Sequence, residues 1–220
     1  MEFRLLYEGE LLPSAGTKKR TPEKHAIRRT FHPQLRRLWE ISPNLKQLAD
    51  ISWIHTLSDD QADELNDNRD NPKYSPNPGE RTSLGLKSIG QKWSRAGYNF
   101  VPLVTEDMAL RCSIDITLLR PEEKKLIFEA GDIDGQLKTL FDALRMPKNA
   151  DETSGIAPNE DEDPFFCLLE DDRLVTEVRV NTDTMLLLPN TREVRANDAH
   201  AIIHVSLNHK THRTFNNYFG

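Results

Sequence analysis

The sequence contains few cysteines and no long hydrophobic run. Only 2 of its 220 residues are cysteine, and Cys112 and Cys167 both stand among apolar neighbours. We therefore expect buried thiols in a reducing compartment rather than a disulfide framework. The longest apolar runs, such as 185–188, are far too short to cross a bilayer, and the first residues lack the apolar core of a secretory signal. These absences predict a cytoplasmic protein with no membrane partner.

The glycine-rich motifs of nucleotide chemistry are also missing. Neither G-x-x-x-x-G-K-[ST] nor G-x-G-x-x-G occurs, so nucleotide-driven and dinucleotide chemistry have no support in the sequence. Histidine pairs such as His200 and His204 invite a zinc interpretation, but they fall in a stretch that has the pattern of a strand. No cysteine or acid completes a tetrahedral site beside them. We therefore favour histidines that are exposed or hydrogen-bonded.

Net charge argues at first against a nucleic-acid partner, because the chain carries a formal charge of -6 and DNA-binding surfaces are usually basic. The charge is unevenly distributed. Residues 1–50 contain ten Lys and Arg against six Asp and Glu, whereas residues 120–175 contain seven against fifteen. The basic residues concentrate in one cluster: Lys18, Lys19, Arg20, Lys24, Arg28, Arg29, Arg36 and Arg37. Such a cluster can neutralise phosphates, although a solvated surface has the same composition.

Periodicity of the apolar residues predicts an α+β fold with a mixed sheet, in one domain spanning 1–220. The clearest strand is Met108–Leu118, where apolar and polar residues alternate, and the clearest helix is Asp134–Arg145, with apolar residues at i, i+3, i+4 and i+7. Further expected elements are strands at 3–9, 174–180 and 201–208, helices at 32–41 and 89–96, an irregular segment at 66–85 and an acidic loop at 147–164.

Two acidic motifs carry the candidate chemistry. The first is D-x-D-G-x-x-K at the start of the amphipathic helix, with Asp132, Asp134 and Lys138. Two carboxylates one residue apart can approach one hard divalent cation, and a lysine one helical turn later can hold a phosphate. Taken alone, this motif is better explained by ordinary helix capping and an i,i+4 ion pair. The second motif is D-D-x-x-V, in which Asp171 and Asp172 lead directly into a strand.

Together the two motifs resemble the RusA family of Holliday junction resolvases, over roughly residues 108–180. The resemblance implies that Asp132, Asp134 and Asp172 bind metal and that Lys138 is essential for catalysis. It also implies a RusA-like mixed sheet packed with helices, and a homodimer. Residues 20–105 have no counterpart in short family members and are expected to be a divergent insertion. Gly135 departs from the family's usual asparagine, and the acidic loop 147–164 is a second insertion.

These observations predict a Mg²⁺-dependent endodeoxyribonuclease, with Mn²⁺ as a substitute metal, that cuts four-way junctions or other branched DNA during recombination and repair. Lys18, Lys19, Arg20, Arg28 and Arg29 are the expected contacts to the DNA backbone. A RusA-fold DNA-binding or regulatory protein with weak or lost cleavage is the main alternative. An unrelated protein whose aspartates cap a helix is the third interpretation.

Overall fold

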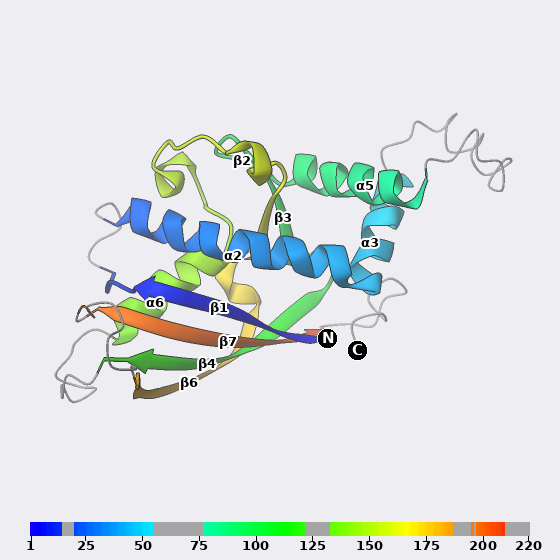
Figure 1. The fold of residues 1–220 in the computed structure, drawn as a ribbon. Helices are drawn as coiled ribbons and strands as arrows, with labels where there is room; N and C mark the ends of the chain where they lie inside the picture. Colours follow the sequence, from blue (N-terminus) through cyan, green and yellow to red (C-terminus); the bar gives the residue numbers. More distant parts are fainter. Residues whose placement is uncertain (15–19, 55–76, 122–132, 187–194, 196, 210–220) are drawn as a thin grey trace, which may run out of the picture.

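The computed structural model describes residues 1–14, 20–54, 77–121, 133–186, 195 and 197–209. It has the predicted α+β architecture, with a four-stranded and a three-stranded sheet on either side of a long helix (Figure 1). The strands are β1 (Glu2–Glu10), β2 (Ser94–Arg95), β3 (Tyr98–Val104), β4 (Leu110–Arg120), β5 (Phe165–Leu169), β6 (Val175–Thr184) and β7 (Asp198–His209). The helices are α2 (Thr21–Ile41), α3 (Pro43–Ile54), α5 (Pro78–Lys92) and α6 (Ile133–Leu144).

The four-stranded sheet has the order β1-β7-β4-β6. Strand β7 pairs antiparallel with both β1 and β4, whereas β6 pairs parallel with β4 and forms an edge of the sheet. The alternation predicted for Met108–Leu118 is confirmed in β4, where every second residue from Leu110 to Leu118 is buried. The same alternation buries Ile203, Val205 and Leu207 in β7. One face of this sheet therefore supplies much of the core.

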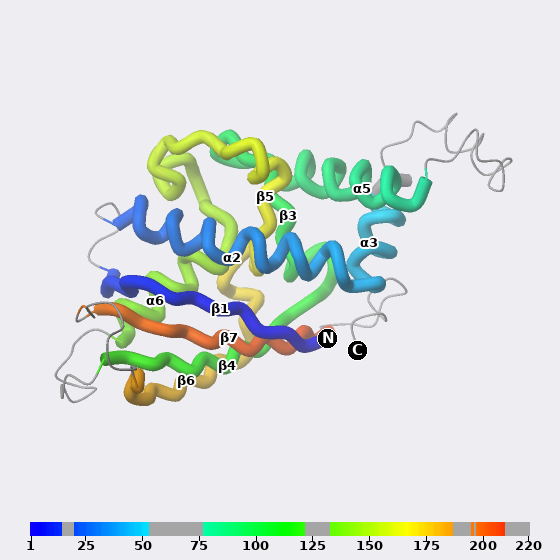
Figure 2. The backbone as a smooth tube through the Cα atoms, viewed as in Figure 1, coloured from blue at the N-terminus to red at the C-terminus, as the bar shows by residue number. Residues whose placement is uncertain are grey.

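Helix α2 lies between the two sheets (Figure 2). Ile27, Phe31, Leu35 and Trp39 recur every four residues and form a buried stripe that joins the main core. A second buried side of the helix, which includes His32, contacts β5. The helix begins at Thr21 rather than at the predicted residue 32, because its N-terminal half is buried through polar and charged side chains that hydropathy does not reveal.

Helices α3 and α5 pack against each other beyond the C-terminal end of α2. The expectation of irregular structure over 66–85 is wrong for residues 77–85, which cap and begin α5; residues 55–76 lie outside the described part of the chain. Asn77 and Glu80 form a reciprocal capping box, and Pro78 occupies the first position of the helix. Gly85 permits the close approach of α5 to α3, since a Cβ at this position would collide with the carbonyl oxygen of Ala49. Helix α5 also replaces the short helix expected at 89–96.

The three-stranded sheet, in the order β2-β3-β5, was not predicted from the sequence. Strands β3 and β5 pair in parallel, and β5 is buried along its whole length. A strand buried on both faces reads as a continuous apolar run, which lacks the two-residue period that identified β4 and β7.

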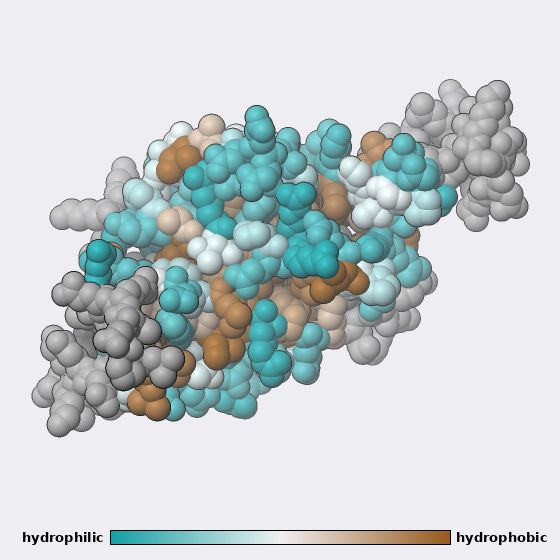
Figure 3. Space-filling view, in the orientation of Figure 1, coloured by the Kyte–Doolittle hydropathy of each residue, from teal (hydrophilic) through white to brown (hydrophobic). Residues whose placement is uncertain are grey.

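The surface of the described residues is largely polar. In the orientation of Figure 3 hydrophilic side chains cover most of α2, and hydrophobic side chains form small separate patches. Within the described part of the chain, no helix has the length and apolar character needed to span a membrane.

Two buried histidines of α2 are held in the neutral form. The His32 ring accepts the backbone N–H of Phe166 at Nδ1 (2.9 Å) and lies 3.0 Å from the Asp161 carbonyl oxygen at Nε2. Burial lowers the pKa of His32, and burial together with the charges of Arg28 and Arg29 lowers the pKa of His25 to about 4. Adding a second proton to either ring, which makes it cationic, therefore opposes this packing.

We expect the free energy of unfolding to fall as the pH drops from 7 to 4. In the unfolded state His25 takes up a proton as the pH falls below about 6.5, whereas in the folded state it does so only near pH 4. The contribution of neutral His25 to the free energy of unfolding is therefore fully present above pH 6.5 and is lost as the pH falls from 6.5 to 4. The expected loss is on the order of 2 kcal/mol. Urea unfolding at pH 7, 5.5 and 4.5 measures it, and His25→Gln should flatten the profile. A wild-type profile that is flat over this range contradicts the assignment.

Candidate functional site

Helix α6 carries Asp134 and Lys138 of the D-x-D-G-x-x-K motif, beside the edge strand β6 of the four-stranded sheet. Its buried positions follow a helical period: Gln136, Thr139, Leu140, Ala143 and Leu144. Asp134 lies in the first turn, and both Asp134 and Lys138 are exposed on the other side of the helix. Leu137 and Phe141, which the sequence assigns to the buried stripe, are partly buried beside them. The predicted helix is confirmed, with its start at Ile133.

The start of α6 is fixed against the residues that follow β1. The backbone N–H of Ser14 donates to the Gly135 carbonyl oxygen at 2.9 Å, and the buried Gln136 amide donates to the Leu11 carbonyl oxygen at 2.8 Å. A Cβ at position 135 would lie 2.9 Å from the Pro13 Cβ and 3.0 Å from the Ser14 nitrogen. Glycine at this position is therefore explained by close packing.

Gly135→Asn should destabilise the protein by about 1–3 kcal/mol, because the new side chain has to displace the Pro13–Ser14 segment from α6. Urea unfolding checks the prediction. Gly155→Asn is the matched control, since asparagine tolerates the left-handed backbone there and a Cβ meets nothing within 4 Å. Equal stability of the two variants would contradict the packing explanation.

The acidic pair precedes the edge strand β6, as expected. Asp171 caps the short 3-10 helix η3 (Asp172–Leu174), its Oδ1 accepting the backbone N–H of Arg173 at 3.1 Å, and Leu174 anchors the turn in the core. Burial raises the pKa of Asp171, but this is outweighed chiefly by the hydrogen bond from the Arg173 backbone, and the pKa lies below its ordinary value. Asp171 therefore has a structural role, and Asp172 is the exposed member of the pair.

Asp134, Lys138 and Asp172 line one cavity of about 580 Å³, which we call the carboxylate cavity. Its other lining residues are Leu137, Phe141, Val175, Thr176, Glu177 and Val178, from α6 and β6. The two motifs are therefore brought together, although Lys138 and Asp172 are 34 positions apart in the chain. Among the described residues no group of three or more His, Cys, Asp or Glu side chains is placed to hold a metal ion. Asp132, the third expected ligand, lies outside the described residues.

A second cavity of about 450 Å³, the basic cavity, lies between the start of α2, the end of α6 and the segment that follows it. It is lined by Thr21, Lys24, Arg28, Lys138, Asp142, Arg145, Lys148, Asn149, Asp151, Glu152 and Asp172. Lys138 and Asp172 line both cavities, so the two adjoin at these residues. Sequence reasoning missed Lys24, Arg145 and Lys148 as neighbours of the site, because only the fold brings α2 and this segment to α6.

The prediction that Arg28 contacts DNA is corrected by the structure. Arg28 is only 1% exposed, and its guanidinium donates to the carbonyl oxygens of Asp142 (2.7 Å), Arg145 (3.1 Å) and Glu152 (3.3 Å). Burial lowers its pKa to about 10, which leaves it charged at neutral pH. Arg28 therefore joins three segments of the fold.

The remaining expected DNA contacts divide into three kinds. Arg29 forms an ion pair with the buried Glu162, with 2.7 Å between Nε and Oε1. Arg20 is half-buried at the start of α2, and its Nη1 finds no hydrogen-bond partner among the described residues. Lys18 and Lys19 lie outside the described part of the chain. Of these four positions, Arg29 therefore has its charge compensated within the fold, and the role of the others as DNA contacts stays a prediction.

The acidic segment 147–164 packs against α2, on the side away from the four-stranded sheet in the view of Figure 1. It contains two short 3-10 helices, η1 (Ala150–Thr153) and η2 (Glu160–Glu162). Glu152 pairs with Arg145 at 2.9 Å, and Glu162 pairs with Arg29. Part of its negative charge is therefore neutralised inside the fold, although Asp151 and Glu152 also line the basic cavity.

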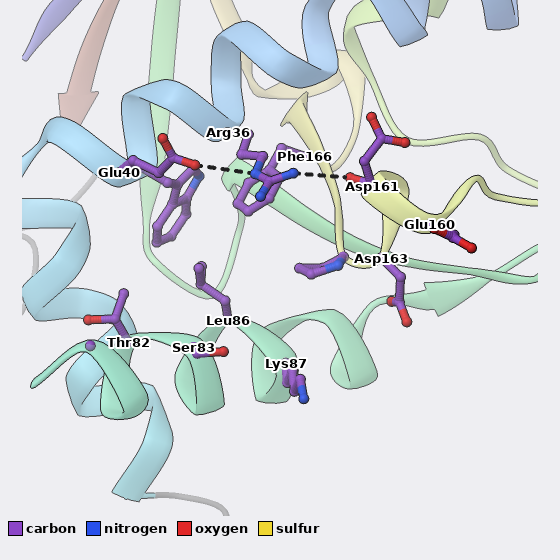
Figure 4. Close-up of a pocket in the computed structure, with 13 residues that line it drawn as sticks. Arg36, Glu40, Thr82, Ser83, Leu86, Lys87, Glu160, Asp161, Asp163 and Phe166 are labelled. Carbon is purple, nitrogen blue, oxygen red and sulfur yellow. Dashed lines mark hydrogen bonds and ion pairs between the residues drawn. The ribbon is translucent and has the colours of Figure 1, made fainter. Parts of the chain in front are cut away.

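A third cavity, of about 530 Å³, lies between the C-terminal half of α2, α5 and the end of the acidic segment (Figure 4). Arg36 bridges its wall, with 3.3 Å from Nε to the Glu40 carboxylate and 3.5 Å from Nη1 to the Asp161 carbonyl oxygen. Leu86 points from α5 toward Arg36, whereas Lys87 points away. This cavity contains none of the motif residues.

Neither the cysteines nor the paired histidines form a site in the described structure. Cys112 and Cys167 are free and buried, and burial raises both thiol pKa values, that of Cys112 to about 12. Protonated thiols are poor nucleophiles. His200 and His204 lie on β7 and each faces a glutamate of β1, at 3.3 Å from Glu8 and Glu2.

Comparison of the chain with protein-family models, with curated proteins and with solved structures finds no match.

Proposed function

We propose that the protein is a divalent-metal-dependent endonuclease that hydrolyses phosphodiester bonds in branched DNA. The observation that carries the proposal is the meeting of Asp134, Lys138 and Asp172 in one open cavity. A helix cap and an isolated acidic turn do not require these three side chains to share a cavity, whereas a phosphodiesterase site does. The resemblance of both motifs to the RusA family supports the substrate class.

The residues of the carboxylate cavity fit a magnesium ion. Asp134 and Asp172 offer carboxylate oxygens, which are the ligands that Mg²⁺ prefers, and the open cavity leaves room for its water molecules. Mn²⁺ accepts the same ligands. Asp132, two residues before Asp134, is the third ligand in this proposal. The bound ion would supply activation of water and neutralisation of phosphate charge.

The other residues of the cavity orient the substrate. Lys138 has no ion pair to a described residue, so its ammonium group is free to donate to a phosphate oxygen and to stabilise charge that develops there. Leu137, Phe141 and Val178 form an apolar wall beside these charges. An apolar wall lowers the local dielectric and strengthens the attraction between lysine and phosphate.

Three features favour a non-cleaving relative: Gly135, the acidic segment and the net charge of -6. The first two are accounted for by packing and ion pairing within the fold. Gly135 permits the packing of α6 against Pro13, and the internal ion pairs of Glu152 and Glu162 reduce the repulsion expected from the acidic segment. We therefore propose an active enzyme, which acts as a homodimer so that two sites can cut opposed strands of a junction. A cytoplasmic location fits the two free cysteines.

The test is cleavage of a synthetic four-way junction by the purified protein in Mg²⁺, with EDTA as the blank and the constituent linear duplexes as substrate controls. We expect Mg²⁺-dependent cuts in the junction and far slower cleavage of the duplexes. Binding of the junction without cleavage of any DNA would support the regulatory alternative instead.

A further inference from the structure

The basic cavity beside the carboxylate cavity carries more positive than negative charge. Five of its lining residues are cationic (Lys24, Arg28, Lys138, Arg145 and Lys148), and four are acidic (Asp142, Asp151, Glu152 and Asp172). The surplus is notable in a chain whose net charge is -6. A cavity with this balance favours an anion.

The inner wall of the basic cavity is a buried charge network. Asp142 pairs with Lys24 at 2.5 Å and with Arg145 at 2.8 Å, and Arg145 also pairs with Glu152 at 2.9 Å. Arg28 lies behind them and donates to backbone carbonyl oxygens, which do not cancel its charge. Three cations are therefore balanced by two carboxylates in this wall.

One buried donor in the wall is left without an acceptor. The Arg145 side chain is 6% exposed, and its Nε–H has no hydrogen-bond partner among the described residues. Buried donors without acceptors are uncommon and costly, since each has lost its water. This observation is independent of the charge count, and it shows that the cationic wall has more donors than the described carboxylates and carbonyl groups satisfy.

Two lysines stand at the mouth of the basic cavity. Lys138 and Lys148 are exposed, and neither side chain forms an ion pair with a described residue. Lys138 and Asp172 also line the carboxylate cavity. A strand whose reacting phosphate occupies the carboxylate cavity would therefore have an adjacent phosphate close to Lys148.

We propose that the basic cavity binds a second backbone phosphate of the DNA strand, next to the one that is cut, and that Lys148 is its principal contact. This inference rests on the proposed function, because it takes a DNA strand to be the substrate. A diester phosphate provides acceptor oxygens for the lysine ammonium, and its negative charge offsets the surplus of the wall. Lys148 lies in the acidic insertion, so the insertion contributes to substrate binding.

The test compares full-length wild type with Lys148→Ala and with Lys46→Ala, an exposed lysine of α3 that lines none of the three cavities. Binding of a four-way junction is measured in Ca²⁺ over a range of salt concentrations, and cleavage is measured in Mg²⁺. We expect Lys148→Ala to weaken binding about tenfold. The slope of log K against log salt should become less negative by about 0.9. Lys46→Ala should match wild type.

The outcomes separate this inference from the proposed function. Junction binding that depends on Lys148 in a protein that cuts no DNA would refute the proposed function and retain the phosphate site. Wild-type binding and cleavage with an unchanged salt slope in Lys148→Ala would refute the phosphate site alone. Absence of junction binding refutes both. Calorimetric titration with inorganic phosphate adds a further arm: binding that requires Lys148, with unchanged DNA affinity, would indicate a free-phosphate site and overturn the inference.

Discussion

Asp134→Asn should lower the rate of junction cleavage in Mg²⁺ by about 10²- to 10³-fold while the protein stays folded. Asp134 is exposed in the first turn of α6 and lines the carboxylate cavity, so the substitution removes a proposed metal ligand without disturbing the core. Single-turnover cleavage of a labelled four-way junction measures the effect. Raised Mg²⁺ should restore part of the activity, because the variant binds the ion more weakly.

Asp161→Asn provides the matched control for charge. Asp161 is an exposed carboxylate beside the C-terminal half of α2 and does not line the carboxylate cavity, and its substitution also removes one negative charge. We expect its cleavage rate to equal that of wild type.

Asp172→Asn should resemble Asp134→Asn, and the double variant should be little slower than either single one, because the proposal has both carboxylates hold the same ion. Full activity of Asp134→Asn would refute the assignment.

Arg28→Leu should lower the free energy of unfolding by about 3–5 kcal/mol. The guanidinium donates to carbonyl oxygens of Asp142 on α6, Arg145 just after α6, and Glu152 in the acidic segment. Leucine cannot donate, so three buried or partly buried carbonyl groups lose a partner and the paired carboxylates nearby lose a compensating charge. Chemical denaturation at pH 7 measures the change.

Arg36→Leu on the same helix is the control for Arg28→Leu. Arg36 is about half exposed, and it forms an i,i+4 ion pair with the similarly exposed Glu40 on the surface of the helix. Such pairs contribute little, and we expect a change within about 0.5 kcal/mol. If the two variants lose equal stability, Arg28 does not have the joining role that its hydrogen bonds indicate.

The predictable parts of the fold are those with one buried face. Strands β4 and β7 and helix α6 each divide their residues between core and solvent, so the period of the apolar residues identified them. Strands β3 and β5 lie in the interior and show no such period. The start of α2 was missed for a different reason: its buried residues there include His25 and Arg28, which hydropathy assigns to solvent.

In the candidate site too, some residues could be predicted from the sequence and others could not. Local motifs identified Asp134, Lys138 and Asp172, and the fold places all three around one cavity. Charge counting failed for Arg28, because it cannot distinguish a cation at the surface from one whose donors are used by buried carbonyl oxygens. Lys148 was missed because it faces α6 from a segment that the acid count marked as repulsive to DNA.

The central claim is that Asp134 and Asp172 hold a divalent ion in the carboxylate cavity. Anomalous diffraction from a crystal of the protein soaked in Mn²⁺ tests it most directly. We predict a Mn²⁺ peak within about 2.5 Å of oxygens of both carboxylates, and loss of that peak in Asp134→Asn crystals. A wild-type crystal with no peak between these carboxylates, at a Mn²⁺ concentration that supports junction cleavage, would contradict the account.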